Sequence, residues 1–141
     1  MAKQTDAVKL LSGVPLFEGC SKKELEAISR AGKEVSHTEG DVLAREGDSG
    51  VGFFMIQDGT AKVSVGGKAR SRLGPGDFFG EISLLDGGPR SATVTAETDV
   101  KLLGLTAWVF KGLIEQNPQI ALKMLRVMAS RLRSASAKPT F

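Results

Sequence analysis

The chain has 141 residues, of which 41% are hydrophobic and 25% charged, and this length and composition fit one globular domain over residues 1–141. The formal net charge of +3 is too small to indicate a nucleic-acid-binding surface. Cys20 is the only cysteine, so no intrachain disulfide can form, and no apolar run reaches the roughly 18 residues that span a bilayer. We therefore expect a cytoplasmic protein.

The first segment, residues 1–32, has the pattern of short helices. Residues 5–12 predict the first of them. Ser21 and Glu24 have the spacing of a capping box, in which each side chain accepts a hydrogen bond from the other residue's backbone N–H, and apolar residues then recur at helical intervals. We therefore predict a second helix over residues 21–31.

Residues 33–105 change to short β-branched or aromatic stretches separated by glycine. The chain holds 17 glycines, and Gly-Asp pairs recur at 40–41, 47–48 and 76–77, where strands are expected to turn. This spacing predicts a mainly β fold with flanking helices: a β-jelly-roll (double-stranded β-helix) barrel with short N-terminal helices and two C-terminal helices.

The two C-terminal helices are predicted within residues 106–136. Thr106 is a candidate N-cap for the first helix, which ends at the Asn-Pro pair of residues 117–118. The last helix, over residues 119–134, has an apolar face and a basic face, so it must pack against another surface. Residues 137–141 predict a loose tail.

Six of the large aromatic side chains are expected to be buried in the core or inside the barrel. They are Phe53, Phe54, Phe78, Phe79, Trp108 and Phe110. The single histidine, His37, falls in a strand-like stretch, and a lone histidine gives no pair that could hold a metal. We therefore expect no metal site.

The stretch GEISLLDGGPRSATV, residues 80–94, places a carboxylate and a guanidinium around a turn. A helical turn after Gly80 would point its first backbone N–H groups at an anion. Arg90 can donate two parallel N–H bonds to the same anion, which suits a phosphate. Ser91 adds a hydroxyl and Ala92 a backbone N–H, so the stretch predicts a phosphate cradle.

Glu81 needs a different partner, because a carboxylate beside a phosphate repels it. A hydroxyl at a fixed distance from the phosphate, as in a ribose, would donate a hydrogen bond to this carboxylate. One carboxylate next to one phosphate cradle therefore predicts a nucleoside monophosphate as the ligand.

The sequence FGEISLLDGGPRSATV, residues 79–94, closely resembles the phosphate-binding cassette of cyclic nucleotide-binding domains. These domains include the bacterial catabolite activator and the regulatory subunits of cyclic-AMP-dependent protein kinase. The resemblance extends over nearly the whole chain, and the spacing GE-x8-RSA within the cassette is specific. It implies a regulatory domain without an attached effector domain.

The resemblance also implies roles for individual residues. Those that match the phosphate and ribose site are Gly80, Glu81, Ile82, Ser83, Arg90, Ser91 and Ala92, and those that match the apolar wall of the base pocket are Val63 and Leu73. Arg131, Ala135 and Ser136 match positions on the activator's dimer helix that touch ribose and base, and Ala135 stands where the activator has a hydroxyl.

The function implied is a regulatory module that binds a cyclic nucleotide, cyclic AMP in preference to cyclic GMP, and signals by repositioning its C-terminal helices. The roughly 30 residues after the barrel leave no room for a DNA-binding domain. We therefore expect a protein partner in trans or a homodimer through the C-terminal helix, with no membrane contact.

Two alternatives stay open: a non-catalytic interaction module with the same fold and little nucleotide affinity, and a cyclic-nucleotide buffer. The presence of both Glu81 and Arg90 favours nucleotide binding. An enzyme is the least favoured class, because the sequence offers no nucleophile–base pair or metal-ligand set to cleave a phosphodiester.

Overall fold

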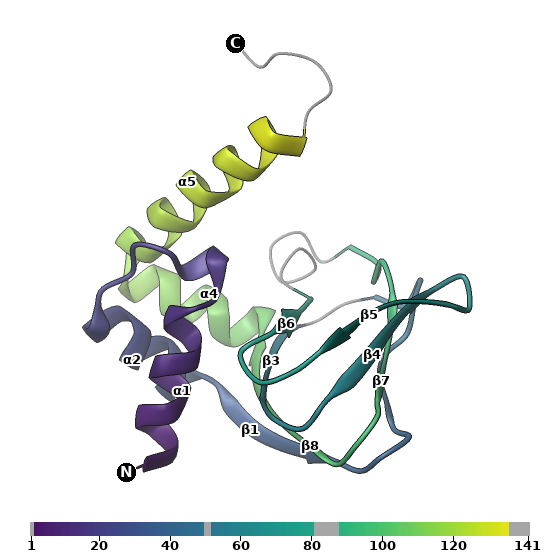
Figure 1. Cartoon of the computed structure of the whole chain (residues 1–141). Coiled ribbons are helices and arrows are strands. Elements are labelled where there is room, and N and C mark those ends of the chain that lie inside the picture. The colour runs from purple at the N-terminus through teal and green to yellow at the C-terminus, as the bar shows by residue number, and fades with distance from the viewer. Residues whose placement is uncertain (1, 50–51, 81–87, 136–141) are drawn as a thin grey trace.

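Two antiparallel four-stranded sheets form the centre of the molecule, and helices from both ends of the chain lie on one side of them (Figure 1). The computed structural model describes residues 2–49, 52–80 and 88–135. The helices are α1 (Ala2–Ser12), the 3-10 helix η1 (Pro15–Phe17), α2 (Lys22–Ala31), α4 (Ala107–Gln116) and α5 (Pro118–Ala135). The predicted mainly β fold with helices at both ends is confirmed.

The strands of each sheet come from distant parts of the sequence. They are β1 (Lys33–His37), β2 (Val42–Ala44), β3 (Gly52–Asp58), β4 (Ala61–Val65), β5 (Lys68–Leu73), β6 (Phe78–Phe79), β7 (Thr93–Ala96) and β8 (Val100–Thr106). The first sheet has the order β1-β8-β3-β6 and the second the order β2-β7-β4-β5. The chain therefore crosses repeatedly between the sheets, as in a jelly roll.

The first sheet is apolar on both faces, so it contributes to two separate cores. Phe53, Met55 and Leu105 face the terminal helices, whereas Ile56 and Leu102 face the second sheet, because side chains alternate along a strand. The core on the helix face, called here the helical-side core, consists of Ala7, Leu11, Val14, Leu16, Phe17, Leu25, Ile28, Phe53, Met55, Leu103, Leu105, Phe110, Leu113, Ile120 and Met124. The inter-sheet cluster consists of Ala44, Ile56, Ala61, Phe79, Val94, Ala96, Val100 and Leu102.

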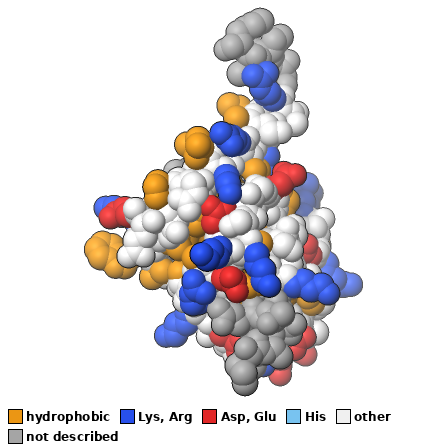
Figure 2. All heavy atoms as spheres, turned by 90° about the vertical axis from the view of Figure 1, so that its left-hand side faces the viewer, with side chains coloured by type: hydrophobic (Ala, Val, Ile, Leu, Met, Phe, Trp, Pro, Cys, Tyr) orange, Lys and Arg blue, Asp and Glu red, His pale blue; other side chains and the backbone are white. Residues whose placement is uncertain are grey.

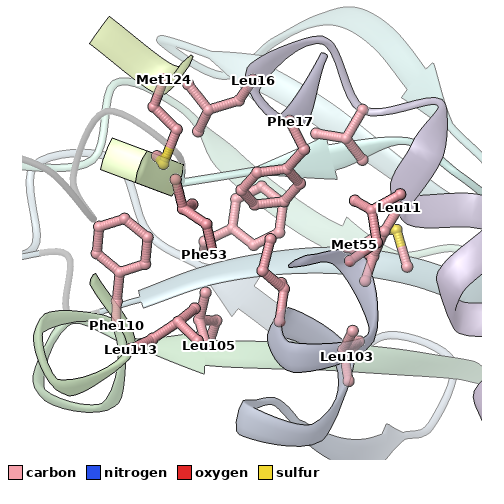
Figure 3. Packing of buried hydrophobic residues seen from close by; sticks show 14 of the residues in the cluster. Leu11, Leu16, Phe17, Phe53, Met55, Leu103, Leu105, Phe110, Leu113 and Met124 are labelled. Carbon is pink, nitrogen blue, oxygen red and sulfur yellow. The ribbon is translucent and has the colours of Figure 1, made fainter. Parts of the chain in front are cut away.

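The helical-side core joins α5 to the N-terminal segment. Figure 3 shows Phe17 of η1 beside Phe53 of β3, with Met124 of α5 in the same cluster. The rings of Phe17 and Phe53 meet edge to face with centroids 5.6 Å apart. The helix α5 packs against η1 in this core and then projects beyond the sheets (Figure 1).

The predicted capping box at the start of α2 is confirmed. The Oγ atom of Ser21 accepts a hydrogen bond from the backbone N–H of Glu24, and Oε1 of Glu24 accepts one from the N–H of Ser21 at 2.7 Å. The same Oε1 atom accepts a hydrogen bond from Nζ of Lys123 on α5 at 2.6 Å. Glu24 is 7% exposed, so this pair is a largely buried link between α2 and α5.

The core assignment of Trp108 is wrong, because this side chain is 84% exposed. Thr106 does cap α4, as predicted, by accepting a hydrogen bond from the N–H of Val109. The face of α4 that packs contains Phe110 and Leu113. Trp108 stands two residues before Phe110, which is about 200° around the helix, and so it points away from the core.

The other expected aromatic positions fit better. Phe53 and Phe110 are buried, and Phe54 is half-buried at the edge of the inter-sheet cluster. His37 is the last residue of β1, with its Nδ1 atom 3.5 Å from Oδ2 of Asp41. In the part of the chain that the structure describes, no group of three His, Cys, Asp or Glu side chains is placed to hold a metal. No helix there has the length and apolarity to cross a bilayer.

Candidate functional site

A cavity of about 300 Å³ lies at the edge of the inter-sheet cluster. It is lined by Ala44, Val63, Leu73, Phe78, Phe79, Gly80, Pro89, Arg90, Ser91, Ala92 and Val94. The walls are apolar side chains of five strands, and the polar groups come from Gly80 and the segment 89–92, just before β7. An apolar pocket of this size with a few convergent polar groups is typical of a small-molecule site.

The guanidinium of Arg90 is held beside the cavity by contacts to β3. Its Nη1 atom donates a hydrogen bond of 2.9 Å to the carbonyl oxygen of Gly52, and its Cζ atom lies 5.9 Å from the centroid of the Phe54 ring. Burial lowers the pKa of Arg90, yet a guanidinium keeps its proton in proteins. A permanent positive charge is therefore held in place where an anion can bind.

The backbone of Arg90 is fixed by the turn that follows β2. The N–H of Arg90 donates to the carbonyl oxygen of Asp48 at 2.7 Å, and the N–H of Gly47 donates to the carbonyl oxygen of Arg90 at 2.9 Å. Gly47 has a φ of +87°, which a residue with a side chain rarely adopts. The Gly-Asp pair at 47–48 thus forms the predicted turn and also positions the arginine, a role the sequence did not indicate.

Gly80 is required by two independent features of the site. Its φ is +88°, in the left-handed region. A Cβ atom at this position would collide with Nη1 of Arg90 and would lie 2.5 Å from the carbonyl oxygen of Gly52. The hydrogen bond between Arg90 and Gly52 therefore passes directly over Gly80 and needs a residue without a side chain there.

The structure brings together six of the predicted site residues around the cavity: Val63, Leu73, Gly80, Arg90, Ser91 and Ala92. Glu81, Ile82, Ser83 and Ser136 lie outside the described residues, as does the predicted helical turn after Gly80. Arg131 is placed on α5 and does not line the cavity.

Five lining residues were not predicted as site residues: Ala44, Phe78, Phe79, Pro89 and Val94. A signal existed for Val94, because it alternates with threonines in β7 and pairs with Val63 on β4, so both point to the same face. Phe78 lies just before the cassette and Phe79 is its first residue, and the sequence predicts only a packing role for both. Ala44 carries no signal in the sequence.

The jelly-roll fold and the placement of Arg90 and Gly80 define a known class of ligand-binding domain. Residues 34–117, more than half of the chain, match the sequence profile of the cyclic nucleotide-binding domain. The chain therefore belongs to the cyclic nucleotide-binding domain family, as the cassette indicated.

Individual proteins of known name are similar to this chain. A cyclic nucleotide-gated potassium channel from Mesorhizobium japonicum is 40% identical over 92% of this chain and 36% of its own length. The cyclic AMP receptor protein of Thermus thermophilus is 33% identical over 89% of this chain and 60% of its own length. The chain thus spans only about a third to three-fifths of these relatives.

Solved structures show the same architecture. The N-terminal domain of a transcriptional regulator from Streptomyces coelicolor A3(2) superimposes with a TM-score of 0.86 at 31% identity, covering 94% of this chain and 98% of that domain. The regulatory domain of Toxoplasma gondii protein kinase A, crystallised with cyclic AMP, gives a TM-score of 0.72 at 31% identity, covering 79% of this chain and 44% of that one. The predicted jelly-roll fold is thereby confirmed.

Proposed function

We propose that the chain binds a 3′,5′-cyclic purine nucleotide, cyclic AMP in preference to cyclic GMP, and acts as a regulatory module without catalytic activity. The observation that carries this proposal is the guanidinium of Arg90, held by Gly52 at the mouth of an apolar cavity of about 300 Å³. A fixed cation beside an apolar pocket suits a ligand with one anionic and one apolar end. A cyclic nucleotide has both ends.

The parts of the nucleotide are assigned along the cavity. Arg90, with Gly80, Ser91 and Ala92, would bind the cyclic phosphate. Val63 and Leu73, which line the cavity from β4 and β5, would pack against the base. From the family match, Glu81 would accept a hydrogen bond from the ribose 2′-hydroxyl, and Ile82 and Ser83 would complete the cradle.

The output surface is proposed to be α5. Leu122, Leu125 and Leu132 on this helix are 50%, 65% and 61% exposed, and Figure 2 shows hydrophobic side chains on the surface of the helical side of the molecule. Their spacing of three and seven residues puts them on one face, as in a helix that packs against another helix. This face would meet a protein partner in trans or the same helix of a second copy.

Binding would change the position of α4 and α5. Arg131 does not line the cavity, so its proposed contact with the nucleotide requires α5 to move toward the barrel. Contacts made in only one position of the helix would shift the equilibrium between positions. Ser136 would join the same contact.

Calorimetry with cyclic AMP tests the nucleotide assignment. We expect Arg90→Ala to lose about 2–5 kcal/mol of binding free energy, because a partly desolvated phosphate loses its charged partner. Arg70→Ala is the matched control, since Arg70 is exposed on β5 and does not line the cavity. Equal affinities of the parent and Arg90→Ala would reject the proposal.

The contact of Glu81 with the ribose is tested with 2′-deoxy cyclic AMP. Loss of the 2′-hydroxyl should cost at least about 1 kcal/mol of binding free energy if Glu81 accepts its hydrogen bond.

A second candidate, an interaction module with little nucleotide affinity, is favoured by the exposed leucines of α5. Sedimentation and calorimetry distinguish the two: this candidate predicts self-association or partner binding with no measurable nucleotide binding.

Amide exchange of residues 106–136 distinguishes a regulatory module that moves its C-terminal helices from a protein that only binds the nucleotide. Binding with unchanged exchange in this segment would support a cyclic-nucleotide buffer.

A further inference from the structure

We propose that Phe54 is a positioning residue for the ligand's phosphate, because its ring supports the guanidinium of Arg90 from below. This inference rests on the proposed cyclic-nucleotide site and names a residue that acts on the ligand only through another side chain. Phe54 is absent from the residues that line the cavity, so it is not a wall of the pocket. Its role follows from the three groups around its ring: the guanidinium of Arg90, the ring of Phe79 and the backbone at Gly104.

The ring of Phe54 is part of a stack beside the cavity. Its centroid lies 5.9 Å from Cζ of Arg90, and it stacks on Phe79 with centroids 5.4 Å apart and an interplanar angle of 26°. Phe79 lines the cavity and pairs with Phe54 across the β3–β6 register. The arginine, the ring beneath it and the neighbouring ring therefore form one packed unit.

The space for this ring is left by a glycine on the next strand. Gly104 of β8 stands directly opposite Phe54, and a Cβ atom on it would lie 2.9 Å from Cε1 and 3.2 Å from Cδ1 of the ring. Glycine in the middle of a buried strand weakens it, so its presence usually marks a close approach. Here the close approach is that of the Phe54 ring, which rests on the β8 backbone.

The guanidinium needs this second support for a geometric reason. The hydrogen bond from Nη1 to Gly52 fixes one nitrogen, and the guanidinium plane can still turn about that contact. A ring face within cation–π distance restricts the turn and compensates for lost hydration of the charge. An arginine whose donors already point at the ligand spends less conformational entropy when the phosphate binds.

The competing explanation is that Phe54 only fills space in the inter-sheet cluster. In that case its loss would lower stability and weaken all ligands alike. The positioning role predicts a selective loss of phosphate recognition. Cyclic AMP and adenosine share a base and a ribose but differ in the phosphate, so the ratio of their dissociation constants measures this recognition.

The test measures that ratio by calorimetry for the parent, Phe54→Leu, Phe54→Tyr and Phe53→Leu. We expect Phe54→Leu to reduce the preference for cyclic AMP over adenosine by about 3- to 30-fold, and Phe54→Tyr, which keeps the ring, to restore most of it. Phe53→Leu is the matched control, because Phe53 is adjacent but faces the helical-side core. It should lower the midpoint of urea unfolding and leave the ratio within about twofold.

Gly104→Ala gives a second test that keeps the ring. The added methyl group must displace Phe54, so the ratio should fall here as well. An unchanged ratio in both Phe54→Leu and Gly104→Ala overturns the inference, as does an equal fall in Phe53→Leu. A parent protein that binds cyclic AMP no better than adenosine would instead reject the proposed function itself, and the two failures are thereby distinguished.

Discussion

The two faces of the β1–β8–β3–β6 sheet are built from the same strands but are filled differently. On the helix face, large side chains such as Phe17, Phe53 and Leu11 pack with almost no exposed area. On the other face, the inter-sheet cluster includes three alanines, and an apolar cavity of about 300 Å³ lies at its edge. Period-two alternation along β3 and β8 thus separates the helical-side core from the inter-sheet cluster. The cavity itself is lined mainly by the second sheet and by β6, both of whose residues border it.

The largest effect should come from the helical-side core. Phe53→Ala is expected to lower the free energy of unfolding by about 3–5 kcal/mol, because the ring is 1% exposed and contacts both Phe17 and Phe78. Urea unfolding followed by circular dichroism measures this loss. Nucleotide affinity of the folded fraction should change less than in Arg90→Ala, because Phe53 does not line the cavity and acts on it only through Phe78. A loss under about 1 kcal/mol would contradict the division of the two faces.

The next effect concerns the link between α2 and α5 on the helix side. Glu24→Gln should cost about 1–3 kcal/mol of stability, because Lys123 keeps its charge and loses its partner. The hydrogen bond from Lys123 is the largest cause that holds the pKa of Glu24 below its usual value. This stabilisation is therefore present above the unfolded pKa, near 4.3, and lost as the pH falls through the lower folded pKa.

Urea unfolding of the parent and Glu24→Gln at several pH values measures this effect. The difference in stability should be constant at neutral pH and shrink as the pH falls below the unfolded pKa of Glu24 and through its lower folded pKa. Lys22→Met, which removes an exposed charge from the first turn of the same helix, serves as the control. A difference that grows on acidification would show that the sign of the linkage is wrong.

On the cavity side, Gly80→Ala should weaken both ligand binding and stability. The left-handed backbone costs alanine about 1–2 kcal/mol, and the new Cβ atom would also displace the guanidinium of Arg90. Gly67→Ala is a matched control, since Gly67 has a φ of +80° and nothing lies within 4 Å of its added Cβ. We expect Gly80→Ala to lose more unfolding free energy than Gly67→Ala, because its Cβ atom also meets the backbone carbonyl of Gly52, and we expect weaker cyclic AMP binding only for Gly80→Ala. Equal cyclic AMP affinities of the two variants would show that Gly80 does not contribute to the binding site.

The smallest effect is expected at the proposed base wall. Val63→Ala should weaken cyclic AMP binding by about 0.5–1.5 kcal/mol, because two methyl groups leave the cavity lining. Val65→Ala on the same strand removes the same groups away from the cavity and should leave calorimetric affinity unchanged. If Val65→Ala weakens binding as much as Val63→Ala, the base does not lie along β4.

The sequence predicted those features that local patterns encode. Ser21 and Glu24 of the capping box are three positions apart, as are Thr106 and the Val109 N–H that it caps, so both caps could be identified without a fold. The cassette was identified because its cavity-lining residues Gly80 and Arg90 lie ten residues apart in one continuous stretch. Residues that are close in the sequence stay close in the folded chain, so such spacings predict contacts directly.

Contacts between distant segments were not predictable in this way. Gly52, whose carbonyl oxygen accepts the hydrogen bond from Arg90, is 38 residues from that arginine in the sequence. Lys123, which donates to Glu24, is 99 residues from it. Which of Phe53 and Phe54 faces the helices depends on the register of β3 in the sheet, so both were assigned to the core alike. Trp108 was assigned by residue type alone, and the helical phase set by Phe110 places it in solvent.

The two-residue strand β6 has a consequence for how this domain can be altered. Its first residue, Phe78, stacks on Phe53 of the helical-side core, and its second, Phe79, stacks on Phe54 beside the cavity. The strand immediately precedes Gly80, and its second residue begins the cassette. A substitution that repositions either ring must shift the backbone they share, so ligand affinity and the stability of the helical bundle cannot vary independently at this strand. Selection on one property at β6 acts on the other.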